Sequence, residues 1–228
     1  MIMNAFKSGL SNNLIKLIAI ISMTIDHIGL ILLNDFTPFR IIGRLAFPIF
    51  AYSISEGCFF TKNIKKYFMK VFLVGVVSQT VYLIATGDWY LNIFLTFSLS
   101  ILIISAYTRF YEEKKEKPKF FIILLLIFIM VYVLDIYQIY FDYGFIGIIM
   151  PFIIYIAPTK EKKIVNTAIM LILLSLNTQG SFVQYFSLLS LPILFLYNGT
   201  RGKYNLKYFF YSYYPLHLGV LYLISFFK

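Results

Sequence analysis

The chain has 228 residues, of which 60% are hydrophobic and only 13% are charged, and its formal net charge is +10. Soluble domains hold about 45–50% apolar and about 25% charged residues, so this composition excludes an ordinary soluble protein. Apolar runs recur between short polar connections, and a helix of about 20 such residues spans about 30 Å of hydrocarbon. The sequence therefore predicts an all-α, polytopic transmembrane helical bundle, with one domain over residues 1–228.

Apolar segments follow one another along the whole chain. The nine predicted spans are 14–33, 39–58, 67–86, 91–108, 119–140, 144–158, 163–179, 182–198 and 206–227. All Lys and Arg residues except Arg40, Arg44 and Lys228 fall on one side of these spans. The positive-inside rule then places the amino terminus in the cytoplasm and the carboxyl terminus outside. The positive charge thus indicates topology, and its placement argues against nucleic acid as a partner.

The first predicted span carries ionisable side chains where a lipid-facing helix would have none. Such a group costs several kcal/mol unless it has a partner or a water-filled cavity, so it is a functional hypothesis by default. Lys16 and His27 are eleven residues apart, which places them on one helix face and about 16 Å apart along the axis. Asp26 points about 100° away from His27 around the same helix. Lys16 is expected at the cytoplasmic interface, and His27 beyond the middle of the membrane.

The second predicted span carries a polar stripe. Arg40, Arg44, Pro48 and Tyr52 recur every four residues, so they share one helix face. Pro48 removes a backbone donor, and we expect a bend beside the stripe. A structural buried pair between Asp26 and Arg44 is the alternative to a site role, but buried ion pairs are poor stabilising devices, so we favour a site role.

Polar side chains are few in the following spans. Glu56 continues the stripe towards the cytoplasm, although an interfacial carboxylate opposite Lys62 or Lys66 is an equally good interpretation. Gln79 lies in the third span and Asn92 at the start of the fourth. These three polar residues are included among the candidates for binding a substrate.

The two histidines of the chain both lie within predicted spans. His217 is near the middle of the ninth span, four residues after Tyr213 and on the same face. For both His27 and His217 the alternative is a structural histidine that bonds a neighbouring backbone or helix. Cys58 is the only cysteine, so an internal disulfide or a cysteine-built metal site is excluded, and we expect no metal.

Several segments resemble the TraX family of membrane proteins and occur in that family's order. They are KLIAIISMTIDHIG (16–29), RIIGRLAFPIFAYSISEG (40–57), NIFLTFSLS (92–100), DYGFIGI (142–148) and YYPLHLGVLYLI (213–224). The founding activity of that family is N-terminal acetylation of a conjugative pilin. The family is similar, more loosely, to acyltransferase-3-like membrane enzymes, which use cytosolic acyl-CoA to modify envelope molecules. Lys16 and His27 match the Arg-x10-His spacing of that group, with lysine in place of arginine.

The resemblance implies a multi-pass acetyltransferase of the inner (cytoplasmic) cell membrane. It would move an acetyl group from cytosolic acetyl-CoA to an envelope acceptor, such as a pilin-type amino terminus or another amine or hydroxyl. His27 is the expected general base. Arg44, together with His217, would stabilise the developing oxyanion or hold Asp26, a further catalytic candidate, in its ionised form. The residues expected to bind the donor are Lys16, Arg40, Glu56, Gln79 and Asn92.

Two other functions stay open. A proton- or ion-coupled transporter would use Asp26, His27, Arg44 and Glu56 as a relay, and it predicts repeat symmetry or paired interrupted helices, which the sequence lacks. A non-enzymatic assembly factor would hold a membrane-inserted pilin. Binding of acetyl-CoA distinguishes the enzyme from both. The acceptor, the acyl chain length and the oligomeric state are not predicted by the sequence.

Overall fold

The structure is a computed structural model that describes residues 9–177 and 182–228. Over these ranges the regular structure is helical, and extended residues form only isolated bridges. The chain divides into two compact units, which we describe separately. Unit 1 consists of Met1–Ser53 and Ala157–Lys228, and unit 2 of Ile54–Ile156.

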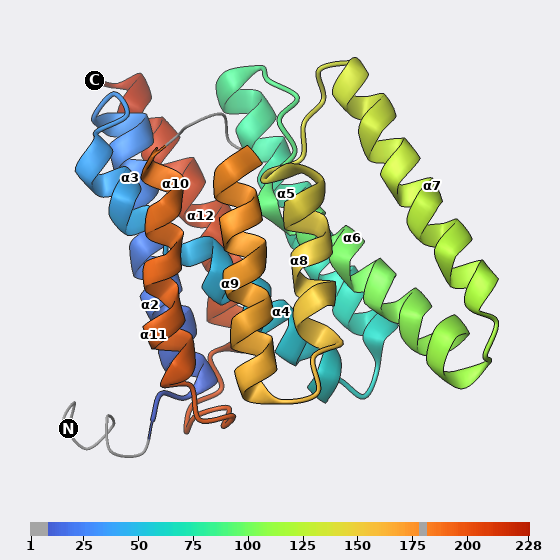
Figure 1. The fold of residues 1–228 in the computed structure, drawn as a ribbon. Helices are drawn as coiled ribbons and strands as arrows, with labels where there is room; N and C mark the ends of the chain where they lie inside the picture. The colour runs from blue at the N-terminus through green and yellow to red at the C-terminus, as the bar shows by residue number, and fades with distance from the viewer. Residues whose placement is uncertain (1–8, 178–181) are drawn as a thin grey trace. The chain divides into compact units, whose positions relative to one another are not determined.

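The first helix that the structure describes in unit 1 is α2 (Asn12–His27), which continues into a π-helical turn, η1 (Ile28–Leu32) (Figure 1). The side chain of Ser11 caps α2 by accepting a hydrogen bond from the backbone N–H of Leu14, which satisfies one of the donors that a helix start leaves unpaired. The π-helical turn directly follows His27. Such turns are frequent at functional sites.

The next helix, α3 (Thr37–Gly43), packs closely against α2. Two glycines make this approach possible. A Cβ atom on Gly29 would lie 2.6 Å from the Cβ of Phe39, and one on Gly43 would overlap the side chain of Asp26. The two backbones therefore meet where a larger residue would separate them.

The second predicted span is not one continuous helix. α3 ends at Gly43, and α4 (Ala46–Phe60) begins three residues later and passes from unit 1 into unit 2. Pro48 lacks the N–H that would bond the carbonyl of Arg44, so the helical hydrogen bonds cannot run through this point. The expected bend beside Pro48 is confirmed as an interruption, and the prediction of a single helix over 39–58 is wrong.

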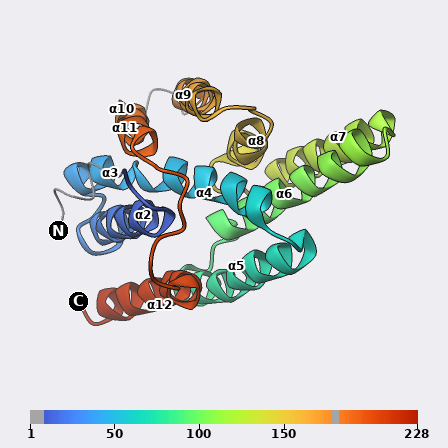
Figure 2. The ribbon, with the colours of Figure 1, turned by 90° about the horizontal axis from the view of Figure 1, so that it is seen from below.

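The remaining helices of unit 1 come from the last third of the chain. They are α9 (Lys160–Asn177), α10 (Phe182–Tyr185), the 3-10 turn η3 (Phe186–Leu189), α11 (Ser190–Phe195) and α12 (Lys207–Phe226). α12 lies on one side of α2, and α3 and α10 lie on the other (Figure 2). α2 is thus the central helix of this unit. The last two residues of the predicted span 163–179 fall outside the described ranges.

Unit 2 is built around α6 (Ile93–Ala106), which continues into a second π-helical turn, η2 (Tyr107–Glu113). α5 (Ile64–Thr86) and α8 (Gly144–Tyr155) both pack against α6. The hydroxyl of Ser100 on α6 donates to the carbonyl of Ile148 on α8 at 2.7 Å. α7 (Lys117–Ile136) leaves most of its apolar side chains exposed, as a lipid-facing helix does.

Within the described ranges, four helical segments are long and apolar enough to cross a membrane. They are Asn12–Leu32, Ile64–Thr86, Ile93–Glu113 and Lys117–Ile136, and shorter apolar helices cover Gly144–Tyr155 and Phe182–Phe195. Each of the predicted spans overlaps helical residues. The helical fold and the membrane character agree with the sequence, whereas the number of nine crossings and their orientation stay predictions.

Connections that were predicted to share a side of the membrane lie together in each unit. In unit 1 the backbone N–H of Asn198 donates to the carbonyl of Leu10 at 2.9 Å, which joins two predicted cytoplasmic segments. In unit 2 the N–H of Asp142 donates to the carbonyl of Leu91 at 2.9 Å, which joins two predicted outer turns. The alternation of charge along the chain is therefore consistent with the internal geometry of both units.

Candidate functional site

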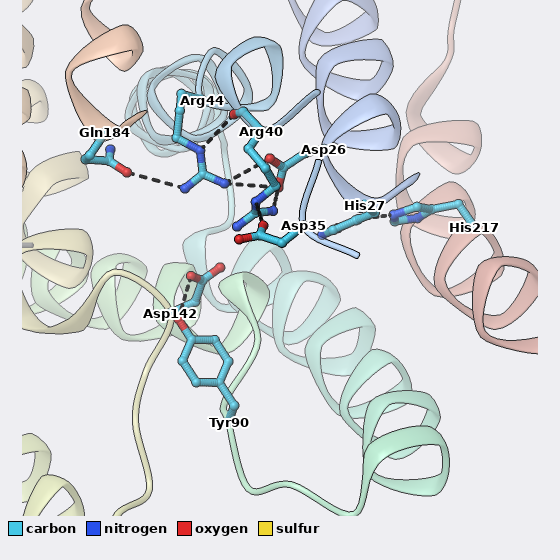
Figure 3. Close-up of polar contacts among 9 residues, drawn as sticks. All are labelled: Asp26, His27, Asp35, Arg40, Arg44, Tyr90, Asp142, Gln184 and His217. Atoms are coloured by element: carbon cyan, nitrogen blue, oxygen red, sulfur yellow. Dashed lines mark hydrogen bonds and ion pairs between the residues drawn. The ribbon is translucent and has the colours of Figure 1, made fainter. Parts of the chain in front are cut away.

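A direct hydrogen bond joins His27 on α2 to His217 on α12 (Figure 3). Nδ1 of His27 lies 2.7 Å from Nε2 of His217. The ring centroids are 4.9 Å apart and the ring planes differ by 18°. With the centroids 4.9 Å apart, the two nitrogens can approach to 2.7 Å only if they point directly at each other. The rings therefore lie edge to edge in almost one plane, rather than face to face. In this arrangement the shared hydrogen lies along the bond.

The second nitrogen of His217 determines the protonation of the pair. Nδ1 of His217 lies 3.1 Å from the carbonyl oxygen of Tyr213, and because a carbonyl only accepts, this nitrogen carries the hydrogen. In the neutral ring Nε2 of His217 then has the lone pair, and it accepts from Nδ1–H of His27. The lone pair of neutral His27 is thereby placed on its Nε2. Nε2 of His27 is the basic atom of the pair.

A second contact between the same two helices lies about one turn before the histidines. The hydroxyl of Thr24 donates to the carbonyl of Ile20 at 2.8 Å. Its oxygen is therefore the acceptor in the 2.8 Å bond with the hydroxyl of Tyr213. The ring of Tyr213 is also nearly parallel to that of His217, at a centroid distance of 5.4 Å. Tyr213 thus fixes His217 through its backbone and anchors α12 to α2 through its side chain.

Lys16 contacts α12 on the same face of α2. Its Nζ atom lies 5.7 Å from the centre of the Phe210 ring, a cation–π contact. Lys16 and His27 both reach α12, so their predicted shared face is confirmed. Residues met later along α2 contact residues met later along α12, so the two helices run parallel.

Asp26 and two arginines form a separate centre. Nη1 of Arg40 donates to Oδ2 of Asp26 at 2.6 Å, and Nη2 of Arg44 donates to its Oδ1 at 2.9 Å. Asp26 is only 8% exposed. Arg40 also pairs with Asp35 at 3.0 Å, but the Asp35 side chain is 70% exposed. The prediction that both arginines share one helix face is confirmed, because both donate to Asp26.

The arginine centre and the histidine pair lie on different sides of α2. Asp26 faces α3, whereas His27 faces α12 (Figures 2 and 3). Besides Asp26, the Arg44 guanidinium bonds the carbonyl of Arg40 at 3.2 Å and Oε1 of Gln184 at 3.4 Å. Of the two roles considered for Arg44, this geometry supports holding Asp26 ionised rather than stabilising an oxyanion at His27.

Gln79 and Asn92 lie together in unit 2, at the turn between α5 and α6. The Asn92 amide nitrogen donates to the carbonyl of Gly75 at 2.8 Å and to Oε1 of Gln79 at 2.9 Å. The Gln79 amide nitrogen donates to the carbonyl of Tyr90 at 3.0 Å. These bonds stabilise the turn, which is a structural function. Their role in donor binding stays a prediction.

The sequence candidate Glu56 and the single cysteine, Cys58, lie on α4 in unit 2. Glu56 and Cys58 are both buried, and Cys58 is a free thiol. Across the described ranges, no group of three or more His, Cys, Asp or Glu side chains could hold a metal ion. The donor-binding role of Glu56, like that of Gln79, stays a prediction.

Some polar residues of unit 1 were not singled out from the sequence. Thr24 carried a usable signal, because it precedes His27 by three residues and therefore shares its face. Gln184 carried none, because a single glutamine in an apolar run has no periodic partner. Only the packing of α10 on α3 brings it to Arg44.

The sequence matches one family model along most of its length. The family model described as TraX protein matches residues 11–225, which includes the whole of unit 2 and most of unit 1. The chain is 27% identical over 236 residues to "Probable fimbrial assembly protein FimC, serogroup H1" of Dichelobacter nodosus, covering 91% of this chain and 92% of the relative. It is 55% identical over 40 residues to "Uncharacterized protein RP591" of Rickettsia prowazekii (strain Madrid E), covering 18% and 16% of the two chains. No solved structure gives a significant match. The chain belongs to the TraX protein family.

Proposed function

We propose that this protein is an integral membrane acetyltransferase that moves an acetyl group from acetyl-CoA to an envelope amine or hydroxyl. The observation that carries the proposal is the hydrogen-bonded pair of His27 and His217, in which the carbonyl of Tyr213 sets the tautomer. A base oriented by a second group is the arrangement that acyl-transfer chemistry requires. Membership of the TraX family and a relative named for fimbrial assembly support a pilin-type acceptor.

In the proposed reaction, Nε2 of His27 takes the proton of a neutral amine or hydroxyl as the acceptor atom bonds to the thioester carbonyl carbon. The positive charge that forms on His27 is stabilised by His217, because Nδ1–H of His27 points at the Nε2 lone pair of His217. When the C–S bond breaks, the proton moves from Nε2 to the departing sulfur. The products are the acetylated acceptor and free CoA thiol. General base catalysis of this kind contributes about 10²–10⁴-fold to the rate.

Lys16 is the proposed contact to the phosphates of the donor. It shares the α12-facing side of α2 with His27, at an axial distance of about 16 Å for eleven residues of helix. A lysine binds phosphate as a point charge rather than through a planar fork. The donor would extend along this face, with its phosphates at Lys16 and its thioester at His27.

The decisive experiment measures acetyl transfer by the full chain in lipid nanodiscs. Labelled acetyl-CoA is the donor, and an envelope extract from cells that lack the gene supplies the acceptor. We expect His27→Ala to reduce incorporation by about 10²-fold or more. Ile21→Ala, a change at an exposed position of the same helix, is the matched control and should keep normal transfer. Full transfer by His27→Ala would refute the proposal.

Acetyl-CoA binding is tested separately by thermal unfolding of the detergent-purified protein. A ligand at about 100 times its Kd stabilises the folded state by about 2.7 kcal/mol, and acetate at the same concentration should not. Absence of a shift would favour an ion-coupled transporter or an assembly factor. Trapping of an acetyl group on His27 would instead indicate a two-step reaction in which Nε2 is the nucleophile.

A non-enzymatic role in pilus assembly is the second candidate, because the relative from Dichelobacter nodosus is named for fimbrial assembly. The two functions predict different results for the His27→Ala variant. If the protein only holds a pilin, His27→Ala should still support assembly of pili in a strain that otherwise lacks the gene. If it acetylates the pilin, the assembled subunits should lose the acetyl group.

A further inference from the structure

Two cationic side chains lie near each other at the start of α2. They are Lys16 on α2 and Arg201 in the connection between α11 and α12, and the charge of Arg201 acts on that of Lys16. Lys16 is half-buried and Arg201 is exposed. Within the described part of the chain, neither of them forms an ion pair. Like charges repel each other, and an anion placed beside both would relieve that repulsion.

Hydrogen bonds hold Arg201 against the helix, so its position does not rest on the charge interaction alone. The carbonyl of Arg201 accepts from the backbone N–H of Asn13 at 3.2 Å. The side-chain amide of Asn13 donates to the carbonyl of Tyr204 at 2.6 Å. Asn13 lies three residues before Lys16, on the same side of α2. The connection between α11 and α12 and the start of α2 therefore lie side by side (Figure 1).

Gly202 makes this close approach possible. Its φ is +96°, and a Cβ atom there would lie 2.8 Å from Oγ of Ser11, the residue that caps α2. Glycine suits both the backbone conformation and the lack of space.

The guanidinium of Arg201 has N–H groups to spare. Its Nη2 donates to Oδ1 of Asn205 at 2.6 Å, which fixes one edge of the planar group. Across the described residues, this is its one hydrogen bond, whereas a guanidinium has five N–H donors. The others are free to bind a ligand.

A phosphate group is the ligand that suits this pair. Arginine presents a planar fork of donors that matches phosphate oxygens, and lysine adds a point charge. Acetyl-CoA, the proposed donor, carries phosphate groups. Arg201 lies in a connection that is predicted to face the cytoplasm, which is the side from which acetyl-CoA would arrive.

We propose that Arg201 is a second phosphate-binding residue, and that it holds the phosphate groups of the donor together with Lys16. This inference rests on the proposed acetyl transfer and adds to it a residue that the helical periodicity of α2 could not locate. Lys16 is about 16 Å along the helix from His27, so Arg201 does not reach the reacting atoms. Its loss should therefore raise the KM for acetyl-CoA and leave kcat nearly unchanged.

Thermal unfolding of the full chain in a non-ionic detergent measures binding without any reaction. The probes are CoA, pyrophosphate and dioctanoyl phosphatidic acid. Pantetheine, which lacks phosphate groups, and KCl at matched ionic strength are the controls. We expect a saturable rise of the unfolding midpoint with CoA and pyrophosphate, and a much smaller one with pantetheine.

Charge-removing variants identify the residues that bind. Lys16→Gln should raise the Kd for CoA about tenfold or more, because it removes a half-buried charged contact. Arg201→Gln should raise it about three- to tenfold, because an exposed charge contributes less. Arg201→Lys keeps the charge and should recover part of the affinity. Lys203→Gln removes a charge from the same connection, but Lys203 is not among the groups that act on Lys16, so this matched control should keep the wild-type Kd.

The unliganded protein provides a second readout. Arg201→Gln removes a repulsion from Lys16, so the midpoint without ligand should stay the same or rise. A lower midpoint combined with a wild-type Kd for CoA would indicate that Arg201 is only structural, and would overturn the proposal.

Failure of this inference and failure of acetyl transfer give different results. If Lys16→Gln and Arg201→Gln both weaken CoA binding but wild-type protein transfers no acetyl group, the phosphate site stands and the proposed enzyme does not. If Arg201→Gln transfers acetyl groups with the wild-type KM and Kd, the reaction stands and the role of Arg201 is refuted. A response to phosphatidic acid alone would assign the pair to a lipid headgroup and overturn its assignment to the donor, as would the absence of any response beyond that to KCl.

Discussion

His217 contributes to the proposed chemistry as an acceptor. Its Nε2 receives the hydrogen of His27 Nδ1 while its own Nδ1 is held by the carbonyl of Tyr213. We therefore expect His217→Gln, whose amide oxygen can accept a hydrogen bond, to retain more acetyl transfer than His217→Leu, which cannot accept one. The leucine variant should lose about 10²-fold in rate. Equal rates for the two variants, measured with wild-type protein alongside, would rule out this role.

Asp26 and Asp35 both bind Arg40, so replacing each in turn compares the stability that a buried and an exposed ion pair contribute. Asp26→Asn leaves two arginine side chains without their buried counter-charge, which should cost about 3–5 kcal/mol. Asp35→Asn breaks a pair whose carboxylate is 70% exposed, and such a pair contributes about 0–1 kcal/mol. Reversible unfolding in mixed micelles measures both. Similar losses for the two variants would contradict the buried character of the Asp26 centre.

Single residues were predictable from the sequence where helical periodicity governs their direction. The spacing of Lys16 and His27 placed both on one face of their helix, and the four-residue spacing of Arg40 and Arg44 placed these two on one face of theirs. The partner of His27 was not predictable in this way. His217 is 190 residues away in the chain, and no local pattern states which two helices become neighbours.

At the level of the elements, apolar runs predicted where helices lie but not where they are interrupted. The break between α3 and α4 falls at residues 44–45, one turn before Pro48. The eighth predicted span is likewise divided into α10, η3 and α11, and Pro192 lacks the N–H that would bond the carbonyl of Leu188. Hydrophobicity is insensitive to these interruptions, because the side chains on both sides of each proline are equally apolar.

The close contact of α2 with α3 depends on Gly43. A Cβ atom there would overlap Asp26, so Gly43→Ala should separate the helices and cost about 1–3 kcal/mol. Gly75→Ala in α5 is the comparison with weaker crowding, since its Cβ would lie 2.9 Å from the flexible Cδ2 of Leu95 and 3.2 Å from the Leu95 backbone nitrogen, without the overlap found at Gly43. There the better helix propensity of alanine, about 1 kcal/mol, offsets the crowding. Thermal unfolding should show a clear loss for Gly43→Ala only, and equal midpoints would contradict the tight contact.

For the whole molecule, the distribution of lysine and arginine predicts which connections face the cytoplasm. In a Cys58→Ser background, Asp88→Cys should react with a membrane-impermeant maleimide on intact cells. Lys115→Cys should react only after the membrane is made permeable, because its connection carries the positive charge that stays inside. Labelling of Lys115→Cys on intact cells would overturn the predicted orientation.

The division into two compact units was not evident from the sequence. Unit 1 combines the first 53 residues with residues from Ala157 onward, and neither a linker nor a change in composition marks the boundaries. The boundary at Ser53 even lies inside α4. A sequence pattern reports local burial, whereas a compact unit is defined by contacts between segments that are distant in the chain.

The hydrogen bond between His27 and His217 also bears on how the protein is made. The two residues are separated by 190 positions, and a ribosome adds about 5–20 residues per second. His27 therefore waits about 10–40 s for its partner after it has been synthesised. During that interval helix α2 is present without α12, so a nascent chain has no oriented base. If the protein is the proposed acetyltransferase, catalytic competence would arise only when α12 has been inserted, and unfinished chains would not transfer acyl groups.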